Sequence, residues 1–447
     1  MVKKLFGTDG VRGVANIYPM TAEFAVKLGM ACGLKICKKF KKVAIGRDTR
    51  VSGEMLEAGL IAGLTAAGVD VVKLGILPTP AITSITPDLC VDMSFMITAS
   101  HNPYQDNGIK LITAEGDKFT DDVTSELEDM IEKNQFELDS AHLGTVSENK
   151  EAVLLYLEKA KDFMLEDHPL KGLRVVLDCA NGVFSDIMPK VFMNLGAGVI
   201  AIGNKPDGYN INKDCGSQHT EQMFETVKGA HAHLGIAVDG DGDRIIVCNE
   251  KGEKVASEQL MAFVTKTLKE EGKYNGNAFV STVLSNTALE RYIRAMGMDY
   301  YSTKVGERAV IVKMKEVGCS VGGEESGHVV VSNYSKTGDG MIVALLVSLG
   351  LIKSGKKMSE IFPLFEFDPF VFVNTRVSAR EVVAQAVADE KVKATVKAAE
   401  EKMAGKGRVV LHPSGTEPVI RVWVSGEDKA LVEELSSSII DEIKRFA

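Results

Sequence analysis

The sequence predicts an α/β protein of four successive units, in which three similar α/β units precede a smaller α+β unit. Short β-branched runs alternate with helical patterns along most of the chain, which is typical of α/β folds. Pro363 and Pro369 mark a linker, and after it the pattern changes to strands and helices of a different order. The first three units have similar lengths, which suggests structural repetition without a clean sequence repeat.

The first unit contains alternating strand and helix patterns from residue 43 to residue 165. Ser52 and Thr120 are expected to cap the starts of two helices, and Gly68 to end the first of them. In this unit we expect strands at 43–46, 69–74, 94–98 and 108–112, a polar loop at 100–108, and helices at 52–68, 120–133 and 153–165.

The second and third units continue the alternation. In the second we expect strands at 173–177, 234–238 and 244–248, a helix at 185–194 and a polar loop at 203–216. In the third we expect a strand at 278–282 and helices at 256–271, 286–295 and 341–351. The last of these helices is apolar all round, which predicts that it is buried.

The C-terminal unit is predicted to combine three strands with two helices. The strands are expected at 370–377, 408–411 and 419–424, and the helices at 379–404 and 428–445. These patterns place the four domains at 1–155, 156–254, 255–368 and 369–447.

The composition is that of a globular chain with a slight acidic excess. Of its 447 residues 45% are hydrophobic, and 61 Asp and Glu stand against 52 Lys and Arg, a net charge of −9. This composition excludes a disordered chain and argues against a basic nucleic-acid-binding surface. It still allows a few local cations and backbone N–H groups to bind a phosphate.

No feature directs the chain to a membrane or to secretion. The longest apolar stretch, 341–352, has 12 residues, against roughly 18 or more for a membrane-spanning helix. The N-terminus has no apolar signal region, and the seven cysteines are scattered without a Cys-x-x-Cys pair. We therefore expect a cytoplasmic protein with reduced thiols and no membrane partner.

A serine loop follows the strand at 94–98. The sequence there is Thr-Ala-Ser-His-Asn-Pro, so Ser100 and His101 stand at a strand end. A serine in this position is a nucleophile if a neighbouring group activates or modifies it. Taken alone, the segment is also compatible with an ordinary polar turn, and it lacks the Gly-x-Ser-x-Gly pattern of hydrolases.

An acidic loop at 239–244 reads Asp-Gly-Asp-Gly-Asp-Arg. Three carboxylates this close repel one another unless a cation lies between them, and hard oxygen ligands suit Mg²⁺. A solvated acidic turn is the simpler alternative. A calcium-binding EF-hand fails because Arg244 stands where that loop requires Gly. An aspartyl phosphatase motif is also disfavoured, because it usually lies near the N-terminus with Thr or Val after it.

Two further loops carry hydrogen-bonding groups. Residues 322–328 read Gly-Gly-Glu-Glu-Ser-Gly-His, a set of side chains suited to sugar hydroxyls. Residues 413–418 read Pro-Ser-Gly-Thr-Glu-Pro and precede Arg421. Hydroxyls and backbone N–H groups in such a turn form an anion site, to which a guanidinium can add a bidentate contact. Taken alone, each segment is more simply interpreted as a plain turn.

Three more motifs accompany the four loops. They are Phe-Gly-Thr-Asp-Gly-Val-Arg-Gly at 6–13, Gly-Arg-Asp-Thr-Arg at 46–50 and Pro-Thr-Pro at 78–80. With the four loops, these motifs resemble the α-D-phosphohexomutase superfamily over essentially the whole chain. The resemblance is strongest to bacterial members that act on glucosamine phosphates.

The resemblance implies a heart-shaped, four-domain enzyme with three mixed-sheet α/β domains and a smaller C-terminal α+β domain. Similar enzymes carry a phosphate on the serine that matches Ser100, and Mg²⁺ bridges it to Asp239, Asp241 and Asp243. The resemblance also implies that Arg244 contacts the phosphoserine and that the transferring group is surrounded by Arg12, His101 and Lys110. The sugar would be bound by Glu324, Glu325, Ser326 and His328. The distal phosphate would be bound by Ser414, Gly415, Thr416 and Arg421.

The activity implied is interconversion of glucosamine 6-phosphate and glucosamine 1-phosphate through a 1,6-bisphosphate, in a monomer or homodimer. Glucose or mannose phosphates are the alternative substrates in the same superfamily, and a metal-dependent sugar phosphatase is a more distant alternative. His101 and Lys110 are both candidates for the general base.

Two positions depart from the family pattern. His412 stands where an Arg usually precedes the phosphate loop, and an imidazole binds a phosphate dianion more weakly than a guanidinium. Glu325 stands where the glucosamine enzymes usually have Gln or Asn. Glu325, or less favourably Glu307, is our candidate for the carboxylate that reads the ammonium at C2 of the sugar.

Overall fold

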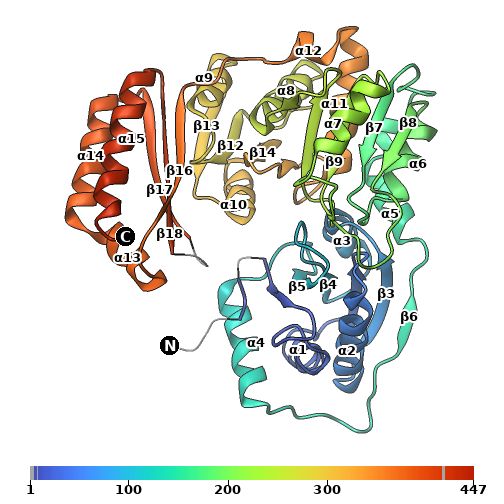
Figure 1. Cartoon of the computed structure of the whole chain (residues 1–447). Coiled ribbons are helices and arrows are strands. Elements are labelled where there is room, and N and C mark those ends of the chain that lie inside the picture. The colour runs from blue at the N-terminus through green and yellow to red at the C-terminus, as the bar shows by residue number, and fades with distance from the viewer. Residues whose placement is uncertain (1–4, 8, 415–417) are drawn as a thin grey trace.

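The computed structural model describes residues 5–7, 9–414 and 418–447. It contains four sheets, each with its own helices, and Figure 1 shows the four resulting units one after another around the molecule. The first three sheets are mixed and the fourth is antiparallel. The predicted order of three α/β units followed by one α+β unit is therefore confirmed.

The first unit is a six-stranded sheet in the order β1-β5-β4-β2-β3-β6. Its strands are β1 (Val11–Val14), β2 (Lys42–Arg47), β3 (Asp70–Ile76), β4 (Met93–Ile97), β5 (Asp106–Thr113) and β6 (Val146–Glu148). Its helices are α1 (Ala22–Lys35), α2 (Ser52–Ala66), α3 (Thr79–Ile85), η1 (Thr86–Asp88), α4 (Asp121–Lys133), α5 (Ala152–Lys159) and η2 (Lys161–Met164). Helices α1 and α2 approach closely because Gly63 faces the α1 backbone, where a Cβ would lie 2.0 Å from the Val26 carbonyl oxygen.

The second unit has the strand order β11-β10-β9-β7-β8. Its elements are β7 (Arg174–Asp178), α6 (Ile187–Asn194), β8 (Gly198–Ile202), α7 (Glu221–Gly229), β9 (Leu234–Val238), β10 (Ile245–Asn249) and β11 (Lys254–Val255). Strands β9 and β10 pair antiparallel. The residues that connect them in this hairpin are 239–244, the acidic loop.

The third unit has the strand order β13-β12-β14-β15. Its elements are α8 (Ser257–Glu270), β12 (Ala278–Thr282), α9 (Thr287–Ala295), β13 (Asp299–Thr303), α10 (Glu307–Val317), β14 (Val321–Gly323), β15 (Val329–Val331), α11 (Gly340–Ser354) and α12 (Met358–Ile361). Helix α11 is buried along almost its whole length, as its all-round apolar sequence predicts.

The fourth unit is a three-stranded sheet in the order β16-β18-β17. Its elements are β16 (Phe370–Arg376), α13 (Arg380–Ala388), α14 (Glu390–Met403), β17 (Gly407–Pro413), β18 (Val419–Gly426) and α15 (Lys429–Lys444). Its helices lie on the outer side of the sheet, and the other side is turned toward the third unit (Figure 1).

The apolar cores show how the units are joined. One buried cluster contains residues of the first three units, among them Leu77, Val175 and Met341, whereas the fourth unit has a separate core. Polar pairs connect the fourth unit to α9: Arg291 to Glu427 at 3.6 Å and Arg408 to Glu290 at 2.9 Å.

Several predicted boundaries were wrong. The helix expected at 153–165 ends at Lys159, and the chain continues as η2. The helix expected at 379–404 is two helices, because Asp389 leaves the helical conformation and caps α14 through its side chain. Ser52 is the first residue of α2 rather than its cap, and its Oγ accepts from Asn107.

Many elements of the structure were not predicted from the sequence. Among them are β1, α1, α3, β8, α7, β13, α10, β14 and β15. The domain boundaries themselves stay a prediction. Within the described residues no helix is long and apolar enough to cross a membrane.

Candidate active site

Ser100 lies in a sharp turn after β4. Its φ of 53° is in the left-handed region, which a non-glycine residue adopts only when surrounding contacts hold it. The buried Arg50 donates to the carbonyls of Ser100 (2.9 Å), Asn102 (2.9 Å) and Pro103 (2.6 Å). Asp48 pairs with Arg50 at 2.9 Å and compensates its charge. A buried guanidinium therefore fixes the turn that presents Ser100.

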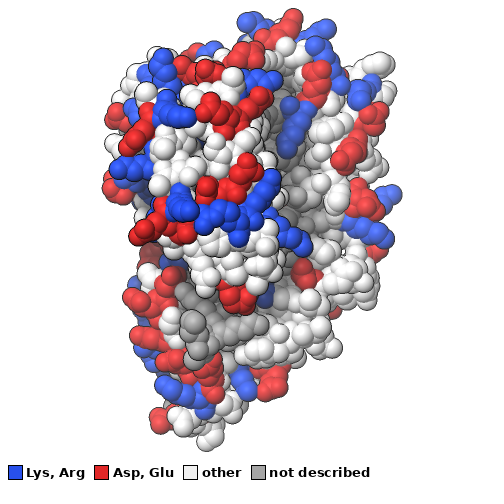
Figure 2. All heavy atoms as spheres, turned by 60° about the vertical axis from the view of Figure 1, so that its left-hand side comes forward, with Lys and Arg blue, Asp and Glu red and all other residues white. Residues whose placement is uncertain are grey.

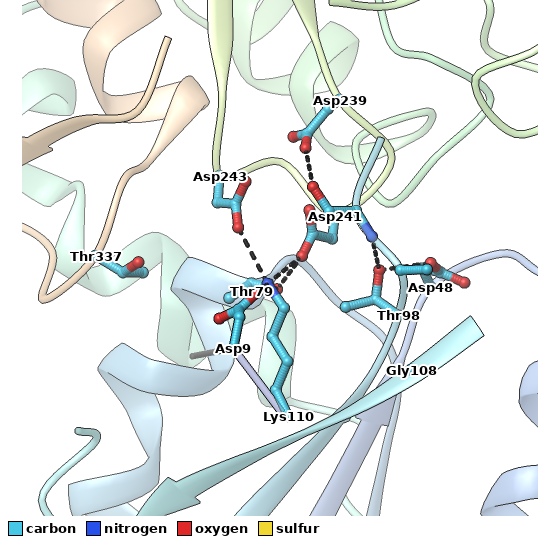
Figure 3. A network of polar contacts seen from close by, with 12 residues as sticks. Asp9, Asp48, Thr79, Thr98, Gly108, Lys110, Asp239, Asp241, Asp243 and Thr337 are labelled. Atoms are coloured by element: carbon cyan, nitrogen blue, oxygen red, sulfur yellow. Dashed lines mark hydrogen bonds and ion pairs between the residues drawn. The ribbon is translucent and has the colours of Figure 1, made fainter. Parts of the chain in front are cut away.

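The Ser100 hydroxyl points toward the acidic loop of the second unit. It donates to Asp239 Oδ2 at 2.6 Å and lies 3.3 Å from His101 Nδ1. The Ser100 N–H donates to Thr98 Oγ1. The Thr98 hydroxyl in turn donates to Asp48 (Figure 3). The fold thus brings together the serine loop and the acidic loop, which lie in different units.

Asp239, Asp241 and Asp243 form the acidic cluster that the sequence predicts. One carboxylate oxygen from each lies within 4.8 Å of the others, and all three residues are buried. Burial, together with the charges of its two neighbours, raises the pKa of Asp239 well above its usual value. Asp241 Oδ1 is buried without a hydrogen-bond partner. Three clustered carboxylates, with an unpartnered buried oxygen on Asp241, fit a divalent cation such as Mg²⁺.

Lys110 supplies positive charge to this cluster in the structure. Its Nζ lies 2.8 Å from Asp241, 3.1 Å from Asp243 and 3.2 Å from Asp9 (Figure 3). Burial alone would lower the pKa of Lys110, but the carboxylates of Asp241, Asp9 and Asp243 outweigh it and raise that pKa well above its usual value. Lys110 is therefore held as an ammonium among three carboxylates.

The histidines of the site have opposite environments. Burial, with the nearby Arg244 and Arg12, lowers the pKa of His101 to about 3, so that its imidazole is neutral. Burial also disfavours the charged form of His328. However, Asp243 at 3.2 Å and Glu324 at 3.3 Å outweigh it and raise the pKa of His328 to about 10.

Arg12 and Arg244 both lie close to the serine loop. Arg12 pairs with Asp9 at 2.7 Å and approaches the Ala99 carbonyl at 3.5 Å. The backbone N–H of Arg244 donates to Asp239 Oδ1 at 3.1 Å. Both guanidinium groups line the same cleft as Ser100, so both can meet an anion on the serine.

The sugar loop extends from β14 into the cleft. Glu324 Oε1 accepts from the Gly306 N–H at 2.8 Å, and Ser326 Oγ lies 3.3 Å from His328 Nδ1. These contacts orient a carboxylate, a hydroxyl and an imidazolium toward one space, as a polyhydroxyl ligand requires.

The two candidate C2 readers differ in their partners. Glu307 is engaged by Lys118 at 2.9 Å, by the Gly338 N–H at 2.8 Å and by the Thr337 hydroxyl. Glu325 accepts from the Thr282 hydroxyl through Oε2 at 3.0 Å, and burial raises its pKa to about 7. The structure therefore leaves more of the Glu325 carboxylate for a ligand.

The predicted phosphate loop lies partly outside the described residues, which include Ser414 and Arg421 but not Gly415 and Thr416. His412 on β17 stands opposite Arg421 on β18. Burial and the neighbouring guanidinium lower the pKa of His412, and its Nδ1 is buried without a partner. The weaker anion site expected at His412 stays a prediction.

A cleft of about 1230 Å³ joins the first three units. The predicted site residues that line it are Arg12, Ser100, Asp243, Arg244, Glu324, Glu325, Ser326 and His328. No described residue of the fourth unit lines it, so Ser414 and Arg421 are not part of this cleft. Over the face turned forward in Figure 2, basic side chains are interspersed with acidic ones rather than gathered together.

Sequence reasoning missed several residues that contact the site. Asp9 pairs with Lys110, Arg12 and Lys118, and Thr79 donates its hydroxyl to Asp241 at 2.6 Å. Both lie in motifs that the sequence displays, at 6–13 and 78–80. Lys118 carries no such signal, because a lone lysine after a strand is ordinary in any sequence.

The chain matches known families along its length. Residues 3–138, 155–252 and 256–366 match, in that order, α/β/α domains I, II and III of phosphoglucomutase/phosphomannomutase, and residues 373–442 match its C-terminal domain. Phosphoglucosamine mutase of Paramagnetospirillum magneticum is 45% identical, with 100% of both chains covered. Phosphoglucosamine mutase of Rhizobium rhizogenes is 42% identical, over 99% of this chain and 98% of that protein.

Solved structures share the fold. A phosphoglucomutase/phosphomannomutase family protein from Burkholderia thailandensis superposes with a TM-score of 0.82 at 23% identity, covering 100% of this chain and 98% of that one. N-acetylphosphoglucosamine mutase from Aspergillus fumigatus, in complex with GlcNAc-6P and magnesium, gives a TM-score of 0.62 at 16% identity. That comparison covers 90% of this chain and 82% of the other.

Proposed function

This chain belongs to the phosphoglucomutase/phosphomannomutase family, and we propose that it interconverts glucosamine 6-phosphate and glucosamine 1-phosphate as a phosphoglucosamine mutase. The observation that carries the proposal is the 2.6 Å contact between Ser100 Oγ and Asp239, which joins a serine in a held turn to a three-carboxylate cluster. The full-length relatives named phosphoglucosamine mutase support the choice of sugar.

Asp239, Asp241 and Asp243 would hold Mg²⁺, together with an oxygen of a phosphate on Ser100. Bound there, Mg²⁺ neutralises charge on the transferring phosphoryl group. The fit rests on the three converging buried carboxylates and the unpartnered Asp241 Oδ1.

In the first half of the reaction, phosphoserine 100 donates its phosphoryl group to the C1 hydroxyl of glucosamine 6-phosphate. The bond between phosphorus and Oγ breaks, a bond from phosphorus to the sugar oxygen forms, and glucosamine 1,6-bisphosphate results. The attacking hydroxyl loses a proton and Ser100 Oγ regains one. For the proton that Ser100 Oγ gains here and loses in the return transfer, His101 is better placed than Lys110: its Nδ1 lies 3.3 Å from Oγ, whereas Lys110 is engaged by three carboxylates.

In the second half, the bisphosphate turns over in the cleft and returns its 6-phosphoryl group to Ser100, which leaves glucosamine 1-phosphate. Arg12 and Arg244 would hold the phosphoryl group at Ser100, and Glu324, Ser326 and His328 would hold the sugar. Ser414, Gly415, Thr416 and Arg421 would bind the distal phosphate. This requires the fourth unit to close over the cleft, which would also exclude water that could hydrolyse the phosphoserine.

A coupled assay with glucosamine, glucose and mannose 6-phosphates, each with its 1,6-bisphosphate present, tests the proposal. We expect the highest kcat/KM with glucosamine 6-phosphate. A clear preference for glucose or mannose 6-phosphate would reassign the substrate, and net release of inorganic phosphate would indicate a phosphatase.

The variant Ser100→Ala tests whether Ser100 carries the phosphate. It should abolish mutase activity while leaving the thermal unfolding transition in place, because only a hydroxyl in a loop is removed. Mass spectrometry of the wild type should show a species about 80 Da heavier, as a phosphoryl group on Ser100 requires. Turnover in Ser100→Ala comparable with wild type would refute the role of Ser100.

A further inference from the structure

Three charged side chains that line the cleft form consecutive ion pairs between the first and third units. Lys118 Nζ lies 2.7 Å from Asp9 Oδ1 and 2.9 Å from Glu307 Oε2. Asp9 precedes β1, Lys118 follows β5 and Glu307 begins α10, so three segments distant in sequence meet here. We call this the Asp9–Lys118–Glu307 bridge.

At one end, the bridge reaches the cations beside Ser100. The second carboxylate oxygen of Asp9, Oδ2, contacts Arg12 at 2.7 Å and Lys110 at 3.2 Å. Lys110 in turn contacts Asp241 and Asp243. Asp9 therefore helps to hold both cations, and Lys118 contacts Asp9 through the opposite oxygen.

At the other end, the bridge reaches the sugar loop. Glu307 is anchored to the third unit by the Gly338 N–H at 2.8 Å and by the Thr337 hydroxyl. The residue before it, Gly306, donates its N–H to Glu324 Oε1 at 2.8 Å. The same short segment thus holds a bridge carboxylate and orients the carboxylate that faces the sugar.

We propose that Glu307 and Lys118 are positioning residues, which through Asp9 hold Lys110 and Arg12 at the phosphoryl-transfer centre and connect that centre to the sugar loop. The inference rests on the proposed function, since it concerns the rate of that reaction. It also assigns Glu307 a role other than reading the sugar. A displacement of about 1 Å in a reacting group can cost about 100-fold in rate, so a broken bridge should lower kcat.

A neighbouring ion pair offers a matched control. Lys315 pairs with Asp117 at 2.5 Å, which ties α10 to the segment after β5 as the bridge does. Lys315 is exposed and does not line the cleft. Among the described residues it forms an ion pair with Asp117 and not with a residue of the bridge. Lys315→Gln therefore removes a tie between the same two units without touching the cations at Ser100.

The experiment measures kcat, KM and thermal unfolding for Glu307→Gln, Lys118→Gln, the double variant and Lys315→Gln, with glucosamine 6-phosphate. We expect each bridge variant to lose about 10- to 100-fold in kcat, with KM changed less than about threefold because the groups that bind the sugar remain. The double variant should lose no more kcat than the more impaired of the two single variants, because both substitutions break the same bridge. Lys315→Gln should stay within about twofold of wild type, as a surface pair contributes little.

Four outcomes would overturn the inference: kcat near wild type in both bridge variants, additive losses in the double variant, an equal loss in Lys315→Gln, or an altered preference between glucosamine and glucose 6-phosphates in Glu307→Gln. If Glu307→Gln does not fold, Lys118→Gln breaks the same bridge from its other side and decides the question. A wild-type protein without mutase activity would instead refute the proposed function, so the two failures are distinguishable.

Discussion

Thr79 offers a sharp test of how the acidic cluster is held. Its hydroxyl donates to Asp241 Oδ2 at 2.6 Å, and its backbone N–H donates to the Asp241 carbonyl at 3.0 Å. Both residues are buried, with 4% and 0% of their surfaces exposed. Thr79→Val keeps the side-chain shape and removes only the hydroxyl, which leaves Lys110 as the remaining donor to Oδ2.

The expected effect is on metal binding rather than on folding. A hydrogen bond to a charged group contributes about 1.5–3 kcal/mol, which corresponds to roughly 10- to 150-fold in a binding constant. Loss of a partner that orients a metal ligand typically costs about 10- to 100-fold in affinity. The Mg²⁺ concentration that gives half-maximal activity should therefore rise by about tenfold or more, while kcat at saturating Mg²⁺ stays within a few-fold.

The assay is a Mg²⁺ titration of mutase activity after removal of metal with EDTA. Thr79→Ser is the control, because it retains the hydroxyl and should keep a half-saturating Mg²⁺ concentration close to wild type. An unchanged titration in Thr79→Val, or the same shift in Thr79→Ser, would show that the hydrogen bond to Asp241 does not organise the metal site.

Three further predictions concern the other loops. Asp241→Asn should weaken Mg²⁺ binding and lower the rate, with partial recovery in excess Mg²⁺, and EDTA should inactivate the wild type without unfolding it; full activity in EDTA would exclude a metal role. His412→Arg places a second guanidinium opposite Arg421 and should lower KM for the sugar phosphate by about tenfold, since a charge-assisted hydrogen bond contributes about 1.5–3 kcal/mol; an unchanged KM would place residue 412 away from the phosphate. Glu325→Gln should lower kcat/KM several-fold for glucosamine 6-phosphate and little for glucose 6-phosphate, and equal losses would exclude C2 recognition. Because burial raises the pKa of Glu325 to about 7, its carboxyl gains a proton as the pH falls below 7, so the wild-type preference for glucosamine should weaken there, and in Glu325→Gln it should not.

Local sequence was sufficient for the order of the units and for the acidic cluster. Alternation of strand and helix patterns predicts α/β units because each pattern reflects which side of an element is buried. The three aspartates at 239–243 lie on one short loop, so the sequence alone predicts that their carboxylates lie close together. The same holds for α11, whose all-round apolar surface is compatible only with burial.

Boundaries that depend on capping were less predictable. The break between α13 and α14 occurs because the Asp389 side chain accepts from two backbone N–H groups, in competition with continued helix. Strand β14 has only three residues, and its parallel partner β12, paired through Val280 and Gly322, lies far away in the sequence, so no local pattern marks the ends of β14.

The sequence by itself determined which chemical groups this protein carries: a serine at a strand end, three carboxylates in one loop, and two polar loops suited to a sugar and a phosphate. Only the tertiary structure decided which of them meet. It placed Ser100 of the first unit against Asp239 of the second, and it joined Asp9 and Lys118 to Glu307 of the third. The physical reason is that these contacts join residues more than a hundred positions apart. Such residues meet only where whole sheets pack together, and packing of sheets depends on all their buried residues at once.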